Sequence, residues 1–353
     1  MLRTQESNKK VEIVRNKLAE LDADAIVIRK QCNFSWITAG GRGFIGLASE
    51  NACGCIVVSK DKVYLFANNI EAPRLAREEL PADFAEVVSV EWENDGTLNQ
   101  LITEKVGKFV EDSALEPFFK HHRTTLCEDE IARYRALGSD TVKAVEEVCK
   151  TLPKGATEVE VAGMLASEFW KRGIEPITLL IAADDRSDYV RHYVPTNKTI
   201  EKGVIISVCA RRYGLIASAT RIVAFDKDFA KGYSTLVKVE GDMLDAIRPD
   251  NRISDVFSAC CDSYTRNGLA NEWKNHHQGG LTGYVAREIR ADHNTTSPIA
   301  VNQAYAFNPS MKGAKCEDTV LVTANGLEIL TAPSAGWPTI QVGSYKRADI
   351  LYR

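Results

Sequence analysis

The sequence lacks the long apolar segments that membrane proteins need. Its 353 residues contain no apolar run that approaches the roughly 18 residues of a membrane-spanning helix. The N-terminal stretch MLRTQESNKK is polar and precedes an amphipathic segment, which is not the pattern of a secretory signal peptide. We therefore expect a cytoplasmic protein with no membrane partner.

A strong charge bias is also missing. The chain has 44 Lys and Arg residues against 48 Asp and Glu residues, so its net charge is only −4. A balanced surface of this kind produces no field that attracts polyanions, and no basic run is present. Nucleic acid is therefore not expected as a partner, and the composition is that of a folded enzyme or binding protein.

The nine cysteines form no C-x-x-C motif. They are an odd number, scattered singly or in close pairs, in a chain too large to depend on disulfides. We expect reduced thiols, most of them buried, as in cytoplasmic proteins.

What the sequence does contain is an alternation of strand and helix patterns in its first third. Short apolar strands are predicted at 24–29, 54–60, 62–68 and 85–92, and helices at 8–22, 70–80 and 97–112. The mixture predicts an α/β domain over residues 1–120. Residues 113–127 combine a proline, aromatic residues and charge without periodicity, and we expect a linker there.

The second domain, residues 125–353, begins with two predicted helices. The first covers 128–150, and the second follows a capping box formed by Thr157 and Glu160 and ends before Gly173. Two further helices, over 228–246 and 253–267, are interspersed with strands that precede and follow them. Helices combined with largely antiparallel strands predict an α+β domain.

The two best-formed strands of this domain carry hydroxyls and a thiol but no carboxylate. Ser207 and Cys209 are two residues apart on the first strand, and Ser218 and Thr220 on the second. Residues two apart on a strand share a face. Each pair therefore points to one side of the sheet.

Five segments of the second domain match one known family in the same order. They are CEDEIARYRALGSDTVKAVEEVCKTLPKGATEVEVA, RHYVPTNKTIEKG, YGLIASATRIV, HHQGGLTG and NPSMKGAKCEDTVLVTANGLEILT. They resemble motifs of the creatinase/aminopeptidase P/prolidase family, and NNIEAPRLAREEL in the first domain is similar to a helix of that family. The resemblance implies an α/β N-terminal domain followed by an α+β domain with the pita-bread fold.

The resemblance also shows where this chain departs from the metal-dependent peptidases of the family, which hold two metal ions with Asp, Asp, His, Glu and Glu. It places Ser207 and Ser218 at the Asp positions, Asn308 at the first Glu, Glu317 at the last Glu, and His277, or alternatively His276, at the His. One carboxylate and one imidazole do not offset the charge of two divalent cations. We therefore expect no metal and no other cofactor, although Cys209 beside an imidazole could form a partial zinc site.

Three residues are predicted to be catalytic: His192, Glu317 and His277. The resemblance aligns His192 with the histidine that shuttles a proton in creatinase, a metal-free member, so we expect a general acid and base. A buried Glu317 needs a cation or donor and could bind the substrate. The alternatives are structural: His192 could bridge buried backbone, and Glu317 could pair with Lys315 or Arg221.

The predicted substrate-binding residues are polar side chains in these same segments. They are Arg191, Tyr193, Ser207, Cys209, Ser218, Thr220, His276, Tyr284, Arg287 and Asn308. Among them, Arg191, Tyr193, Tyr284 and Arg287 are candidates to hold a substrate carboxylate, as are Arg211 and Arg212, for which a solvated surface position is the main expectation. Cys209 could be a nucleophile, although most buried cysteines are inert.

The sequence therefore predicts a metal-independent, creatinase-like hydrolase that cleaves a C–N bond of a small polar metabolite. One alternative is a catalytically silent member that binds a ligand or partner. Another is residual Xaa-Pro dipeptidase or aminopeptidase activity with one weakly held metal. The resemblance further implies a homodimer, in which Phe34, Trp36 or Arg42 could complete the partner's site; the alternative is a glycine-rich loop with core aromatics.

Overall fold

The computed structural model describes residues 3–353, which form two compact units. The first comprises residues 3–123 with short additions at 128–130 and 213–215, and the second comprises most of the rest. None of the helices in residues 3–353 combines the length and the apolar character that crossing a bilayer requires.

The first unit is built on a five-stranded mixed sheet with the order β4-β3-β2-β1-β5. Its strands are β1 (Ala25–Lys30), β2 (Asn51–Ser59), β3 (Val63–Asn68), β4 (Glu86–Val90) and β5 (Phe109–Glu111). Its α-helices are α1 (Arg3–Leu18), α2 (Gln31–Ile37), α3 (Ala72–Arg74) and α4 (Leu98–Val106). The helix α3 continues as the π-helical turn η1 (Leu75–Glu79), and the 3-10 helix η2 (Trp92–Thr97) precedes α4. The sequence predicted the first four strands because each is a short, mostly apolar run of β-branched and aromatic residues.

Two predictions in this unit were wrong. The helix predicted over 97–112 ends at Val106, because Gly107 adopts a φ of 83° and the chain then enters β5. Residues 113–127, for which no regular structure was expected, are mostly helical, in η3 (Asp112–Leu115) and α5 (Glu116–Thr124). The helix forms because Phe119 is fully buried and packs edge-on against Trp36 at 6.0 Å, a contact that local periodicity does not reveal.

The segment NFSWITAGGRGF is part of the interior of the first unit. It forms α2 and the following turn, in which Phe34 and Trp36 are buried. Arg42 pairs with the buried Glu79 at 2.9 Å. These contacts favour the core alternative for the two aromatic residues over exposure to a partner chain.

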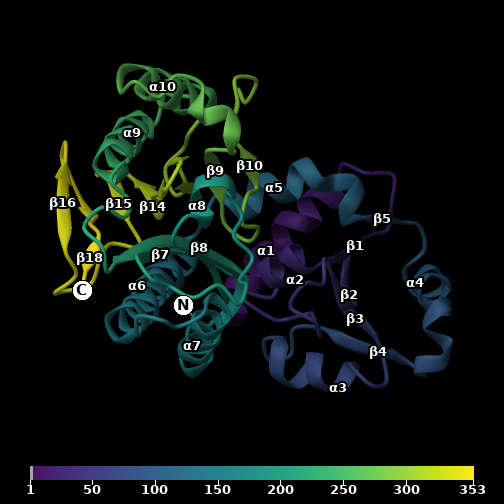
Figure 1. Ribbon diagram of the computed structural model, residues 1–353. Helices are drawn as coiled ribbons and strands as arrows, with labels where there is room; N and C mark the ends of the chain where they lie inside the picture. The colour runs from purple at the N-terminus through teal and green to yellow at the C-terminus, as the bar shows by residue number, and fades with distance from the viewer. Residues whose placement is uncertain (1–2) are drawn as a thin grey trace. The chain divides into compact units, whose positions relative to one another are not determined.

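The second unit contains one large sheet with the order β10-β9-β11-β14-β8-β7-β6, to which β15 and β18 are added at β14 and β8. Its strands are β6 (Glu175–Ala183), β7 (Gly203–Arg212), β8 (Leu215–Ala224), β9 (Gly279–Thr282), β10 (Ile289–Arg290), β11 (Ala304–Phe307), β14 (Asp318–Thr323), β15 (Gly326–Ile329) and β18 (Leu351–Tyr352). Two short hairpins, β12 (Ser310–Met311) with β13 (Ala314–Lys315) and β16 (Thr339–Val342) with β17 (Tyr345–Ala348), lie outside it. Figure 1 shows β7 and β8 as the long central strands of this unit.

Helices cover this sheet. They are α6 (Glu128–Thr151), α7 (Glu158–Lys171), α9 (Tyr233–Ala246) and α10 (Ile253–Arg266), with short turns at α8 (Arg186–Tyr189) and η4 (Glu272–Asn275). The predicted capping box forms, since Thr157 Oγ1 accepts from Glu160 N at 3.2 Å and Glu160 Oε2 accepts from Thr157 N at 2.7 Å. The helices α9 and α10 lie side by side (Figure 1), and their apolar faces line the main hydrophobic core.

Candidate functional site

A cavity of about 320 Å³ opens in the second unit, where several strands of the sheet end. Asn308 directly follows β11, Glu317 directly precedes β14, and His277 lies shortly before β9. The cavity is lined by Thr178, Leu180, His192, Ser207, Val208, Cys209, His277, Ala286, Arg287, Arg290, Asn308, Lys315 and Glu317. A volume of this size fits a small metabolite.

The floor of the cavity, formed by Ser207 and Cys209 of β7, carries a hydroxyl and the thiol that the strand pattern predicted. Ser207 and Cys209 both line the cavity, as expected for residues that share a face of β7. Ser207 Oγ lies 2.8 Å from Thr220 Oγ1, and Cys209 Sγ lies 3.3 Å from Ser218 Oγ. Burial raises the pKa of the Cys209 thiol, with Glu317 acting in the same direction, so the sulfur stays protonated near neutral pH.

Glu317 is a buried carboxylate between two cations. Its Oε1 accepts from Arg287 Nη2 at 2.5 Å, and its Oε2 lies 3.3 Å from Lys315 Nζ. Burial by itself would raise the pKa of Glu317. The charges of Lys315 and Arg287, together with their hydrogen bonds, outweigh that effect and hold the pKa below its usual value. The carboxylate is therefore ionised and already neutralised by protein groups.

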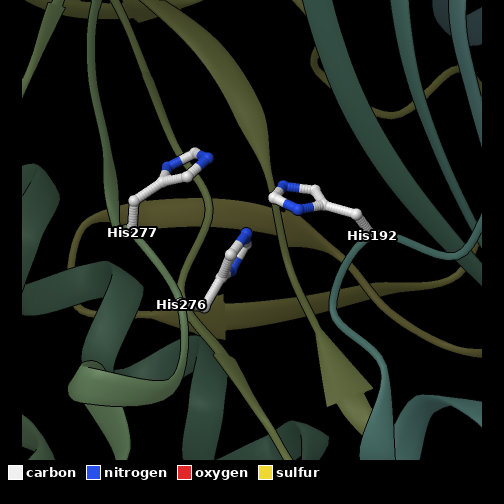
Figure 2. Close-up of side chains that lie close together, drawn as sticks. All are labelled: His192, His276 and His277. Atoms are coloured by element: carbon white, nitrogen blue, oxygen red, sulfur yellow. The ribbon is translucent and has the colours of Figure 1, made fainter.

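Three imidazoles lie close together in this part of the site, and Figure 2 shows their side chains pointing toward one another. One ring nitrogen each of His192, His276 and His277 lies within 4.8 Å of the others. Burial, followed by the charge of Lys315, lowers the pKa of His276 to about 2, and burial, followed by that of Arg287, lowers the pKa of His277 to about 4. The pKa of His192 is also lowered, by partial burial and then by Lys315. All three rings are neutral at pH 7.

Two glycines set the path of the chain beside these histidines. Gly279 has a φ of 99° and Gly280 a φ of 151°, a region that side chains disfavour. A Cβ at Gly279 would lie 2.2 Å from the carbonyl oxygen of Ala306, and one at Gly280 would lie 2.1 Å from that of Ile289. The close pairing of β9 with β11 and β10 therefore requires glycine at both positions, which explains the GG of HHQGG.

The loop that carries His192 is held by one carboxylate on α7. Glu158, which is fully buried, accepts from Ala183 N at 2.7 Å and from Thr196 N at 2.8 Å, and it pairs with Arg186. The two backbone contacts lie on either side of the loop, so Glu158 fixes both of its ends. Arg191 ties the same loop to η4 through an ion pair with Glu272 at 2.9 Å.

Several buried polar atoms that belong to the site have no hydrogen-bond partner among the described residues. They are Nε2 of His276, Nδ1 of His277, Nε of Arg287 and Oδ1 of Asn308. Native proteins leave few such atoms unsatisfied, so each calls for water or a ligand. His276 is oriented toward this role, because its other ring nitrogen lies 3.0 Å from Ser310 Oγ.

The three imidazoles are the residues here that could hold a metal ion. They would supply three neutral nitrogens, one of them oriented by a second contact as metal-binding histidines commonly are. The surroundings oppose a cation, because the cavity wall already carries Arg287, Arg290 and Lys315 against the single carboxylate of Glu317. An incoming divalent ion would meet a net positive field.

The structure brings many of the predicted site residues together but not all of them. His192, His277, Glu317, Ser207, Cys209, Arg287 and Asn308 line the cavity. The His276 ring lies against the rings of His192 and His277. Ser218 and Thr220 are not in the lining but are hydrogen-bonded to Cys209 and Ser207, respectively, which are.

Three predicted carboxylate-binding residues are not on the cavity wall. Tyr193 belongs to the hydrophobic core, Tyr284 is buried away from the lining, and Arg191 is engaged by Glu272 and the carbonyl of Ser187. The surface position expected for Arg211 was wrong as well, because this side chain is buried and ion-paired with Glu175. Arg221 does not contact Glu317 but pairs with Glu146 and Asp318.

Two cations of the site are not predicted as site residues from the sequence. The sequence indicates Lys315 only as a possible structural partner of Glu317, and it gives no indication of Arg290. A cavity position for Lys315 could have been inferred from its spacing, since it lies two residues before Glu317 in the last matched motif. Arg290 gives no such signal, because its place depends on the irregular turn between β9 and β10.

Comparison with known proteins agrees with this architecture. The family model described as metallopeptidase family M24 matches residues 132–324, and that of the creatinase/prolidase N-terminal domain matches residues 10–134. An uncharacterized peptidase of Staphylococcus epidermidis is 21% identical over 91% of this chain and 98% of its own length. A probable dipeptidase of Mycobacterium bovis is 25% identical over 56% of each chain.

The fold is also that of solved structures. The prolidase from Pyrococcus horikoshii OT3 superposes with a TM-score of 0.77 at 19% sequence identity, over 93% of this chain and 99% of that chain. The predicted two-domain architecture is thus confirmed, and the family supports the expectation of a hydrolase. On the evidence of a family model that spans more than half of its length, the chain belongs to metallopeptidase family M24.

Proposed function

We propose that this chain is a metal-independent hydrolase that cleaves a C–N bond in a small polar substrate. The observation that carries the proposal is the pairing of Glu317 with Arg287 and Lys315. Two protonated side chains stand beside the one carboxylate of the cavity, and they supply positive charge that a metal would otherwise provide.

The metal centre implied by the family name does not fit the residues of this site. Of the five positions that the family resemblance assigns to ligands, three carry Ser207, Ser218 and Asn308, which are neutral. The hydroxyls of the two serines are engaged with Thr220 and Cys209. Glu317 is neutralised by its two cations, which leaves His277 as the one uncommitted ligand of the set. Two divalent ions need several anionic ligands, and this set offers none that is free.

In the proposed reaction, His192 acts first as a base. Its neutral ring takes a proton from a water molecule whose oxygen attacks the carbonyl carbon of the substrate. Arg287 and Lys315 stabilise the negative charge that develops on the carbonyl oxygen. The imidazolium of His192 then returns the proton to the leaving nitrogen as the C–N bond breaks, so the products are an amine and a carboxylic acid, which releases its proton to solvent at neutral pH.

Water is a better candidate nucleophile than Cys209. The Cys209 thiol is held protonated by burial and lies against the Ser218 hydroxyl. A protonated thiol is a poor nucleophile, and a neighbouring imidazole that could deprotonate it is not among its hydrogen-bond partners. The same argument disfavours Cys209 as a zinc ligand.

The test is a turnover screen with guanidino, ureido, amide and Xaa-Pro dipeptide substrates, each with and without a strong chelator. We expect turnover that the chelator does not change. In His192→Asn, kcat should fall by about 100-fold or more while KM changes little. The control is His293→Asn, since His293 packs against Phe257 and Trp273 and does not line the cavity.

Two outcomes would replace the proposal. Xaa-Pro cleavage that the chelator abolishes would identify a metal-dependent dipeptidase, as the names of the relatives suggest. Absence of turnover on every substrate class would favour a catalytically silent binding protein, because the departures at Ser207, Ser218 and Asn308 would then mark lost chemistry.

A further inference from the structure

His276 is the third imidazole beside the cavity, and the hydrolysis proposed above gives it no role. The residue is 8% exposed, and its ring centroid lies 5.0 Å from that of His192 and 4.6 Å from that of His277. Nε2 of His276 is buried and has no hydrogen-bond partner among residues 3–353. A buried ring nitrogen of this kind requires a water molecule or a ligand.

Contacts on the other side of His276 fix the direction of its ring. Nδ1 lies 3.0 Å from Ser310 Oγ, and Gln278 Nε2 donates to the carbonyl oxygen of His276 at 2.5 Å. Both partners are held by Tyr264 of α10, whose hydroxyl accepts from Ser310 N at 2.9 Å and lies 3.0 Å from Gln278 Oε1. With Nδ1 engaged by Ser310, Nε2 is the nitrogen that points toward the other two imidazoles (Figure 2).

The rings of His192, His276 and His277 form a cage that is the right size for one water molecule. One nitrogen of each ring lies within 4.8 Å of a nitrogen of both others. Three atoms at such separations share a point within about 2.8 Å of each, which is the length of a hydrogen bond. A water molecule has two hydrogens and two lone pairs. Two rings can accept its hydrogens and the third can donate to one lone pair, which leaves the other lone pair free.

Building on the hydrolase function proposed above, we propose that His276 is a further catalytic residue, which holds the attacking water together with His192 and His277. One hydrogen of the water faces His192, which takes it as a proton while the oxygen bonds to the carbonyl carbon of the substrate. His276 and His277 hold the second hydrogen and one lone pair, and neither gains nor loses a proton overall. The remaining lone pair is directed at the substrate, so the cage orients the nucleophile before the reaction.

The charge around the cage favours water over a cation as its occupant. The cavity wall carries three cations against one carboxylate, which repels a further cation but not a neutral molecule. Water and metal also differ in their distances, because zinc lies about 2.0–2.1 Å from a histidine nitrogen and a hydrogen-bonded water lies about 2.6–3.2 Å away. A structure that resolves ordered water therefore separates the two.

The first experiment is a crystal structure of the whole chain at a resolution that places ordered water. We expect one water molecule within about 2.6–3.2 Å of a ring nitrogen of all three histidines. In His276→Asn the shorter amide can still reach Ser310 but leaves nothing at the position of Nε2, so this water should be lost. In His276→Gln the longer amide restores a polar group there, and the water should be present.

The same variants test the catalytic role, with a substrate identified in the turnover screen. In His276→Asn, kcat should fall about 100-fold with little change in KM, whereas in His276→Gln it should stay within about tenfold of the wild type. A purely structural role would give the opposite order, because Asn keeps the contact with Ser310 and Gln does not. His293→Asn is again the control, since His293 does not line the cavity.

A variant outside the cage covers the case in which both substitutions at His276 prevent folding. Ser310→Ala removes the contact that orients the ring and leaves Nε2 in place, so kcat should fall about tenfold at an unchanged KM. An unchanged kcat in Ser310→Ala or in His276→Asn, a lower kcat in His276→Gln than in His276→Asn, no water in contact with His276, or a metal ion in the cage would each overturn the proposal.

Failure of this proposal can be distinguished from failure of the proposed function. An ordered water on the three rings of a protein without turnover would refute the hydrolase and the catalytic role of His276, and would leave the water site standing. Turnover that is lost in His192→Asn and unchanged in His276→Asn would do the reverse.

Discussion

Replacement of Arg287 by Met tests whether the protein's own cations hold Glu317 ionised. The carboxylate of Glu317 is 4% exposed, and Arg287 donates to it at 2.5 Å. Removal of one partner from a buried pair destabilises proteins by about 3–5 kcal/mol. Lys315 remains at 3.3 Å, so we expect a loss near the lower end, about 3 kcal/mol in the free energy of unfolding.

A matched control separates burial from charge. Arg266 pairs with Asp242 at 2.8 Å, but both side chains are largely exposed, at 60% and 40%. Arg266→Met should therefore cost no more than about 1 kcal/mol. Because the chain has two units, chemical denaturation should be combined with hydrogen exchange of peptides from β14, which reports on this site.

The double variant Arg287→Met/Glu317→Gln completes a double-mutant cycle for this ion pair. If the two side chains interact as the structure shows, the double variant should be less destabilised than the sum of the single variants, by about 1–3 kcal/mol. Additive effects, or an Arg287→Met variant no less stable than Arg266→Met, would show that Arg287 and Glu317 do not stabilise the fold as a pair.

Two further predictions concern the histidines and the loop that carries one of them. Glu158→Gln removes the charge that pairs with Arg186 at the ends of the His192 loop, so kcat should fall about tenfold with little change in KM. Glu168→Gln on the same helix, where the partly exposed Glu168 pairs with Arg172, should leave kcat unchanged. Equal kcat values in the two variants would exclude a positioning role for Glu158. Since His276 and His277 stay neutral in the folded chain while an unfolded histidine takes up a proton below pH 6.5, stability should fall as the pH drops from 6.5 toward 4, by about 1.4 kcal/mol per pH unit for each ring. Denaturation midpoints over this range should show a shallower slope in His277→Asn, and an unchanged slope would contradict the assignment.

Much of the fold could be predicted from local pattern. The strands β1 to β4, β7 and β8 are short apolar runs, and the start of α7 follows from the capping box of Thr157 and Glu160. The helix α5 was missed because its stability comes from Phe119 and Trp36, which are far apart in sequence. Hydrophobic periodicity within a short stretch of sequence carries no information about contacts between residues far apart in the chain.

The site was predictable where one strand or one motif carries the information. Ser207 and Cys209 share a face of β7 because strand residues alternate, and this is visible in the sequence. The ion pair between Arg287 and Glu317 joins residues 30 apart, through a turn whose path depends on Gly279 and Gly280. The spacing of residues in the sequence does not predict the direction of side chains in such an irregular turn.

The same limit explains the residues that were placed wrongly. Arg191 and Tyr193 flank His192, and all three were expected near the substrate. In the structure the loop turns Tyr193 into the core and directs Arg191 to Glu272, while His192 alone reaches the cavity. Neighbours of a site residue in an irregular segment point in different directions, which only the folded backbone reveals.

If protein cations replace metal in this site, as we propose, the purified chain should contain no bound metal, and its metal content can be measured. Elemental analysis should be made on protein purified without chelator and on protein incubated with Mn²⁺ or Zn²⁺ and then freed of unbound ions. We expect no stoichiometric divalent metal in either sample and a melting temperature that chelator does not change, because a metal bound to the native state would raise it. One or two metal ions per chain, removed by chelator together with stability or activity and absent from His277→Asn, would contradict it.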